Sequence, residues 1–197
     1  MLFDKPNCPI NQKPENPFIQ SIKATFKGLW EIFRGFLVLL IIAFIVRYVV
    51  IQPFVVDGPS MQPNFQDKEY LLVNKTSFLF SSPARNNVII FKYPLDPSLD
   101  FIKRIIGLPY EHLEIKDGQV YINGTKLDEK YLQFGQKTSV GDNAILDITL
   151  KKDEYFVMGD NRSGSSDSRA WGTVPKINII GKAWFAVVPF SYFGLIK

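Results

Sequence analysis

The chain has 197 residues, of which 46% are apolar and 21% charged, so it suits one folded domain with additions and excludes a disordered chain. The net charge is only +4 and no long basic run occurs, so nucleic-acid binding is not expected. With Cys8 as the single cysteine and His112 as the single histidine, we expect no internal disulfide, no metal site and no cofactor.

The N-terminal part predicts a tail followed by one membrane span. Residues 1–28 form a tail that is rich in proline before Phe18, and we expect it to be disordered. Residues 29–51 are mainly apolar, which is close to the length of about 20 residues that crosses a bilayer. Pro53 marks the end of this predicted transmembrane helix. A long buried helix of a soluble protein is the alternative, whereas a cleaved signal peptide fits poorly because the apolar region is too long.

Basic residues predict the orientation of the span. Lys5, Lys13, Lys23 and Lys27 precede it, Arg34 lies near its start, and the first basic residue after Ile51 is Lys68. The positive-inside rule therefore predicts a cytoplasmic tail and an extracytoplasmic domain over residues 52–197. Ser60 lies nine residues beyond Ile51, which is at most about 30 Å of extended chain, so we expect it near the outer membrane surface.

After Pro53 the pattern changes to short β-rich runs separated by turns. Asp117-Gly118 and Asn123-Gly124 are hairpin dipeptides. We predict an all-β domain, a mostly antiparallel sandwich or barrel-like sheet. Residues 179–196 are apolar, but Lys182 and Pro189 favour a strand or a membrane-dipping surface over a second span. The predicted strands are residues 70–73, 88–91, 101–106, 119–122, 144–149, 155–158 and 184–188.

The first group of residues with chemical potential surrounds Ser60. The sequence Gly58-Pro59-Ser60-Met61-Gln62-Pro63 has prolines on both sides of the serine and a glycine two residues before it. These residues fix the backbone and expose the hydroxyl on a turn. Taken alone, these residues favour an ordinary turn at the entry of a strand.

The second group is the apolar strand around Lys103. Alternation places Lys103 on the same face as Phe101 and Ile105, and Arg104 on the opposite face. A lysine among apolar neighbours loses hydration, which favours the neutral amine and makes it a usable base. A guanidinium cannot lose its proton in this range, so chemistry selects Lys103 over Arg104. A snorkelling lysine on an edge strand is the alternative.

The third group is the polar loop at residues 159–169, which follows an apolar strand. A calcium-loop spacing fails because Arg162 and Gly164 occupy ligand positions. A solvated loop and a fixed hydrogen-bond network beside a site both remain open. A histidine-based triad would need His112, which alternation places with Glu114 on a solvent-facing side. If Ser60 is a nucleophile, a lysine base is therefore its best partner.

In this order and in this membrane context, the three groups resemble bacterial type I signal peptidases (leader peptidases), which are Ser-Lys dyad serine proteases. The resemblance covers about Gln52 to the C-terminus, with the anchor before it. The matching residues are Gly58-Pro59-Ser60-Met61-Gln62-Pro63, Lys103-Arg104-Ile105-Ile106-Gly107, Gly159-Asp160-Asn161-Arg162, Ser165, Asp167-Ser168-Arg169 and Trp171-Gly172.

The resemblance implies roles for these residues. Ser60 is expected to be the acylated nucleophile and Lys103 the general base, with Ser165 hydrogen-bonding the lysine. The expected charged support is Asp160, Asp167 and Arg169, and the expected substrate-binding residues are Val56, Asp57, Phe101 and Ile102. The implied reaction removes N-terminal signal peptides from exported precursors after small residues at the outer membrane surface. The implied partners are these precursors and the lipid bilayer, and we expect a monomer.

Two departures from the family pattern concern the site and a turn. Many members have a second hydroxyl two residues before the nucleophile, and here that position is Gly58, so the oxyanion would depend mainly on the Ser60 N–H. Many members also have Pro-Gly-Asp after the lysine strand, where this chain has Pro109-Tyr110-Glu111. The turn geometry there is open.

Two other functions compete with this hypothesis. A self-cleaving repressor-type Ser-Lys protease would need a soluble DNA-binding domain at the N-terminus, where this chain has an apolar span. A membrane-tethered β-domain that binds an extracytoplasmic partner, with an inactive dyad, stays open because Gly58 removes an expected oxyanion donor.

Overall fold

The computed structural model describes residues 16–140 and 146–196. The chain divides into two compact units, one ending at Ile45 and the other beginning at Val46. Cys8 and most of the proline-rich tail lie outside the described residues.

The first unit contains one long helix, α1 (Pro17–Ile45). It begins earlier than expected, so the prediction of a disordered tail over residues 1–28 is wrong for residues 17–28. The Phe18 N–H donates to Asn16 Oδ1 at 3.1 Å, so Asn16 caps a helix whose first residue is a proline, a combination that favours helix initiation. A turn of π-helix, η1 (Val46–Val50), follows, and the chain turns to strand at Ile51.

One helical stretch among the described residues, Ser21–Val50, is long and apolar enough to cross a membrane. It contains the predicted span except for its last residue. Its apolar side chains are exposed, including Phe33, Leu39 and Phe44. A helix of this length with no buried face within its own unit is typical of a bilayer-spanning segment rather than of a soluble core.

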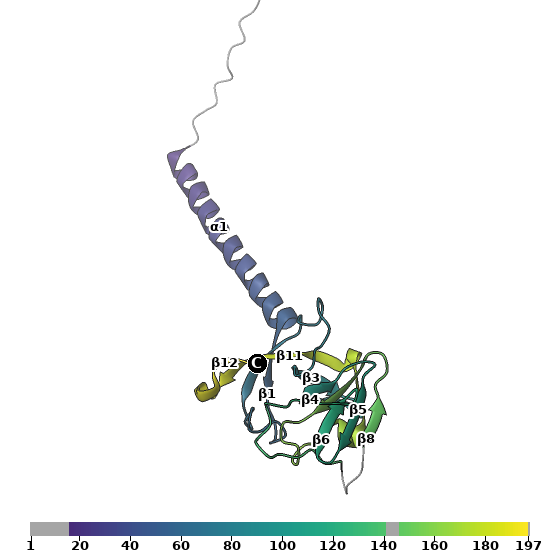
Figure 1. The fold of residues 1–197 in the computed structure, drawn as a ribbon. Helices are drawn as coiled ribbons and strands as arrows, with labels where there is room; N and C mark the ends of the chain where they lie inside the picture. The colour runs from purple at the N-terminus through teal and green to yellow at the C-terminus, as the bar shows by residue number, and fades with distance from the viewer. Residues whose placement is uncertain (1–15, 141–145, 197) are drawn as a thin grey trace, which may run out of the picture. The chain divides into compact units, whose positions relative to one another are not determined.

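The second unit is built from two antiparallel sheets (Figure 1). The larger has eight strands in the order β1-β2-β11-β3-β4-β9-β10, with β12 pairing to β11, and the smaller has the order β7-β6-β5-β8. The larger sheet consists of β1 (Ile51–Val55), β2 (Tyr70–Asn74), β3 (Val88–Tyr93), β4 (Asp96–Gly107), β9 (Glu154–Met158), β10 (Val174–Pro175), β11 (Ile179–Val188) and β12 (Gly194–Leu195). The smaller consists of β5 (His112–Lys116), β6 (Gln119–Ile122), β7 (Thr125–Lys126) and β8 (Leu146–Thr149). The remaining helices are short: α2 (Ser168–Trp171) and the 3₁₀ turns η2 (Lys176–Asn178) and η3 (Phe190–Tyr192).

This architecture confirms the predicted all-β domain, which follows one N-terminal apolar helix along the chain. Both hairpin dipeptides form turns with positive φ: Asp117-Gly118 joins β5 to β6, and Asn123-Gly124 joins β6 to β7. Residues 179–196 form β11, η3 and β12, as a strand-forming segment was expected to do. The run at residues 51–55 was expected to be the end of the helix and a linker, but it is the edge strand β1, in which Pro53 is tolerated.

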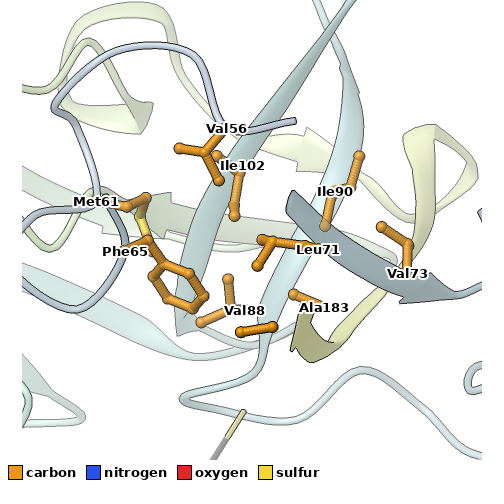
Figure 2. Packing of buried hydrophobic residues seen from close by; sticks show 10 residues of the cluster. Val56, Met61, Phe65, Leu71, Val73, Val88, Ile90, Ile102 and Ala183 are labelled. Atoms are coloured by element: carbon orange, nitrogen blue, oxygen red, sulfur yellow. The ribbon is translucent and has the colours of Figure 1, made fainter. Parts of the chain in front are cut away.

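A core of buried side chains fills one face of the larger sheet (Figure 2). Val56, Met61 and Phe65, which come from the loop after β1, pack in the same cluster as Ile102 of β4. The turn that carries Ser60 and the strand that carries Lys103 are therefore fixed against one another by shared apolar packing.

Candidate active site

Ser60 lies on a hydrogen-bonded turn between two core residues. Val56 and Met61 are fully buried on either side of it, so the turn is pinned to the core. The Gln62 N–H donates to the Pro59 carbonyl at 3.1 Å, and the Asn161 N–H donates to the Ser60 carbonyl at 3.0 Å. These contacts hold the serine backbone while its side chain points to the strand β4.

Lys103 reaches Ser60 from β4. Its Nζ donates to Ser60 Oγ at 2.8 Å, although the two residues are 43 positions apart in sequence. It also donates to the Ile102 carbonyl at 2.9 Å. The side chain lies on the face of Phe101, whose ring centre is 5.5 Å from Nζ. The lysine and the serine predicted as a dyad are therefore in direct contact, at the distance a proton transfer requires.

Burial lowers the pKa of Lys103 from 10.5 to about 8, because a buried ammonium loses its hydration. Lys103 is only 4% exposed. The carboxylates of Asp167 and Asp160 act in the opposite direction and raise the pKa, but burial has the larger effect. The amine is thus partly neutral near pH 8, which a general base needs.

The carboxylates behind the dyad are each bound by an arginine. Asp160 accepts from Arg104 Nε at 2.8 Å and Nη2 at 2.6 Å. Asp167 accepts from Arg169 Nε at 2.8 Å and Nη2 at 2.7 Å, and its Oδ2 also accepts from the Gly159 N–H at 3.0 Å. The predicted supporting residues Asp160, Asp167 and Arg169 are therefore brought together around one loop.

Ser165 differs from the expectation. Its Oγ is buried and makes no hydrogen bond among the described residues, so the expected bond to Lys103 is absent. It still lies beside the catalytic turn, since a methyl group built on Gly159 would come within 2.3 Å of Ser165 Oγ and 2.4 Å of the Ser60 carbonyl. Any side chain at Gly159 would push these two segments apart.

Sequence reasoning missed a segment that braces this loop, residues 128–138. Arg162 is buried and forms an ion pair with Glu129 and a hydrogen bond with Thr138. Tyr131 donates to Glu129 at 2.7 Å and lies under the Arg104 guanidinium, 4.3 Å from ring centre to Cζ. The segment lacks any period of apolar residues, so no pattern in the sequence predicts these contacts.

A groove of about 380 Å³ leads to the dyad. It is lined by Phe54, Val55 and Asp57 on one side and by Leu99, Phe101 and Ile102 on the other. Three of the four expected substrate-binding residues therefore line it. Val56 does not: its side chain lies in the core, its N–H donates to Glu69, and its carbonyl accepts from Lys68. Its neighbour Val55 takes the position in the groove.

The groove has an open strand edge. β4 pairs with β3 from Asp96 to Arg104, whereas β9 pairs with β4 only from Arg104 onward. The backbone groups of Ile105 bond towards Asn86 and Asn87 on the β3 side, so alternation points those of Asp100 and Ile102 to the open edge. This half of β4 can accept one more antiparallel or parallel strand.

One free backbone donor belongs to the nucleophile itself. The Ser60 N–H has no acceptor within the described part of the chain, whereas the Gly58 N–H is already bound to Asp67 Oδ1 at 2.7 Å. Gly58 has a φ of +91°, a conformation that favours glycine. The free Ser60 N–H is therefore the backbone group suited to stabilise an oxyanion.

His112 lies in the smaller sheet, where its Nε2 is 2.7 Å from Asp147 Oδ1. It belongs to β5 and lines neither Ser60 nor the groove, so a histidine triad does not form. No group of three or more potential metal-ligating side chains occurs in residues 16–140 and 146–196.

One family model and several known proteins are similar to this chain. Residues 29–188 match the family model described as signal peptidase, peptidase S26. Signal peptidase IB of Staphylococcus aureus is 34% identical over 180 residues, covering 85% of this chain and 93% of that protein. Signal peptidase I P of Bacillus subtilis subsp. natto is 38% identical over 164 residues, covering 80% and 88%. A crystal structure of a signal peptidase I from Enterococcus faecalis V583 is 34% identical, with a TM-score of 0.45 over 52% of this chain and 97% of that one.

Proposed function

This chain belongs to the signal peptidase family, peptidase S26, and from that premise we propose that it cleaves precursors by acyl transfer through Ser60 and Lys103. As a member it is a membrane-bound serine endopeptidase that removes signal peptides from precursor proteins. The proposal concerns the atoms that carry the reaction, the position of the substrate and the orientation in the membrane. Direct contact between Lys103 Nζ and Ser60 Oγ at 2.8 Å supports it most strongly.

Neutral Lys103 takes the proton of Ser60 as Oγ attacks the scissile carbonyl carbon. A bond forms between Oγ and carbon, and the Ser60 N–H donates to the oxyanion. The lysine ammonium then gives its proton to the leaving nitrogen, the carbon–nitrogen bond breaks, and a serine ester remains. Lys103 next activates a water that hydrolyses the ester and regenerates both side chains.

The acyl half of the substrate occupies the groove as an extended strand. The open edge at Asp100 and Ile102 supplies backbone hydrogen bonds, and the apolar walls from Val55 and Phe101 select small apolar side chains. Cleavage after small residues follows, because a large side chain next to the scissile bond would have to displace core-packed residues such as Ile102.

The orientation in the membrane is part of the proposal. Basic residues before the span favour a cytoplasmic N-terminus and an extracytoplasmic catalytic unit. A protease added to the outer side of sealed cells should then degrade the unit that begins at Val46 and leave the N-terminal tail intact. Degradation of the tail instead would reject this orientation.

Substitution of the dyad tests the mechanism. Ser60→Ala and Lys103→Arg should each lower the cleavage of a signal-peptide-bearing precursor by about 10²–10⁴-fold or more, because the first removes the nucleophile and the second keeps the charge but cannot accept a proton. Initial rates with full-length protein in detergent micelles measure this. Lys130→Arg, at an 87% exposed lysine, is the matched control and should keep full activity. A Lys103→Arg enzyme with more than a tenth of the normal rate would reject the lysine base.

The pH dependence gives an independent test. Because the pKa of Lys103 is lowered to about 8, kcat/KM should rise about tenfold per pH unit below pH 8 and level off above it. A profile that instead kept rising to pH 10 would mean that the amine is not depressed in the free enzyme.

A further inference from the structure

A second cavity, of about 320 Å³, lies against the residues that follow Ser60. Its walls come from three segments far apart in sequence. The lining residues are Gln62, Pro63, Gln66, Gln133, Gln136 and Asn161. Five of the six carry side-chain amides and none carries a charge, so we call it the amide pocket.

The amide pocket and the groove share the catalytic turn as a wall. Pro59 and Ser60 line the groove, and Gln62 lines the amide pocket. Asn161 fixes this wall, because its N–H donates to the Ser60 carbonyl at 3.0 Å and its Nδ2 to the Pro59 carbonyl at 3.2 Å. Along the chain, Met61 alone separates the residues of this turn that line the groove from those that line the amide pocket.

Charges close to the amide pocket are neutralised by partners outside it. Asp160 is paired with Arg104, and Arg162 with Glu129. Gln136 Nε2 donates to the backbone carbonyl of Asp160 at 3.1 Å, so the amide contacts the backbone there and not the carboxylate. These ion pairs leave little net charge beside the amide pocket.

We propose that the amide pocket binds the first residues of the mature chain, immediately after the scissile bond. The inference rests on the proposed function, which gives the groove to the acyl half. Side-chain amides both donate and accept, so they can bond the N–H and C=O groups of a peptide whatever its side chains are. A pocket without charge tolerates mature N-terminal segments with positive or negative net charge, which suits an enzyme that releases many different proteins.

Charge introduced at Gln133 tests this assignment. Gln133 is exposed and lies on a wall that does not belong to the catalytic turn, so its replacement is least disruptive. Gln133→Glu and Gln133→Lys would be assayed as full-length proteins in micelles. The substrates are peptides that carry a single Lys or a single Glu at one of about the first five positions after the scissile bond, because a short pocket reaches no farther.

At one or more of these positions, Gln133→Glu should raise the ratio of kcat/KM for Lys over Glu by about two- to fivefold, and Gln133→Lys should lower it similarly, as expected for a partly exposed charge pair. The same changes at Gln119, in the hairpin strand β6 and outside the amide pocket, should leave the ratio unchanged. Opposite shifts confined to the Gln133 pair would support the assignment.

Three results would overturn it. The first is active Gln133 variants with an unchanged Lys/Glu ratio at every position. The second is an equal shift in the Gln119 pair. The third is a change in kcat/KM of the same size on a substrate whose mature half is replaced by a small chromogenic amine. Such a change would mean that the introduced charge acts on the groove. Failure of the proposed function would look different, since Ser60→Ala would still cleave all substrates.

Discussion

Each face of strand β4 buries one cation, and the two cations have different hydrogen-bond partners. Lys103 and Arg104 are neighbours in sequence, and both are nearly buried, at 4% and 5% exposure. Among the residues that the structure describes, Lys103 bonds only neutral groups, the Ser60 hydroxyl and the Ile102 carbonyl. Arg104 makes two bonds to the Asp160 carboxylate and one to the Asn86 carbonyl.

The difference shows that two buried cations on one strand can be stabilised to different extents, according to whether a carboxylate bonds them directly. On the Arg104 face the ion pair offsets the desolvation of the guanidinium. On the Lys103 face, burial lowers the pKa of the lysine more than the carboxylates of Asp167 and Asp160 raise it, and each of these carboxylates is bound by an arginine.

Breaking the paired face should have the largest effect on stability. Asp160→Asn keeps the shape but leaves the buried Arg104 without a counter-charge, and we expect a loss of about 3–5 kcal/mol in the free energy of unfolding. Urea titration followed by tryptophan fluorescence measures it. Asp128→Asn makes the same chemical change at an exposed ion pair, 73% exposed at the aspartate, and should cost less than about 0.5 kcal/mol. Equal losses in the two variants would contradict the comparison.

Removing the unpaired cation should change how stability depends on pH. The folded pKa of Lys103, about 8, is below its ordinary value of 10.5, so the folded state binds the proton less tightly than the unfolded state. Below pH 8 the wild-type protein therefore carries a penalty of about 3 kcal/mol, and this penalty disappears as the pH rises to 10.5.

Lys103→Met has no such penalty. The free energy of unfolding of the wild type should thus gain about 3 kcal/mol relative to Lys103→Met between pH 8 and pH 10.5. Lys116→Met, at a lysine paired with Glu114 on the smaller sheet, is the control and should show no such gain. A constant difference between wild type and Lys103→Met over this range would mean that the amine is hydrated in the folded protein.

Local pattern predicted both faces of β4 but not what they contact. Alternation alone placed Lys103 with Phe101 and away from Arg104, and turn residues alone placed Ser60 on an exposed bend. The partners of Arg162 could not be predicted, because Glu129 is 33 positions away in a segment without periodicity. The start of α1 was predictable in principle, since Asn16-Pro17 is a capping sequence.

The turn that ends β4 explains the second departure from the family pattern. Tyr110 has a φ of +68°, the left-handed conformation for which many family members use glycine. Glu111 holds the turn closed: its Oε2 accepts from the Leu108 N–H at 2.8 Å, and its other oxygen pairs with Arg85. The turn therefore keeps its shape with a strained tyrosine in the glycine position.

Tyr110→Gly should relieve this strain without touching either face of β4. Tyr110 is 69% exposed, so little packing is lost, and we expect a gain of about 1 kcal/mol in the free energy of unfolding. Glycine also has more freedom in the unfolded chain, which reduces the gain. Tyr121→Gly, at an interior position of strand β6 with negative φ, is the contrasting control and should destabilise. A loss of stability in Tyr110→Gly would mean that the ring, rather than the backbone conformation, holds the end of β4.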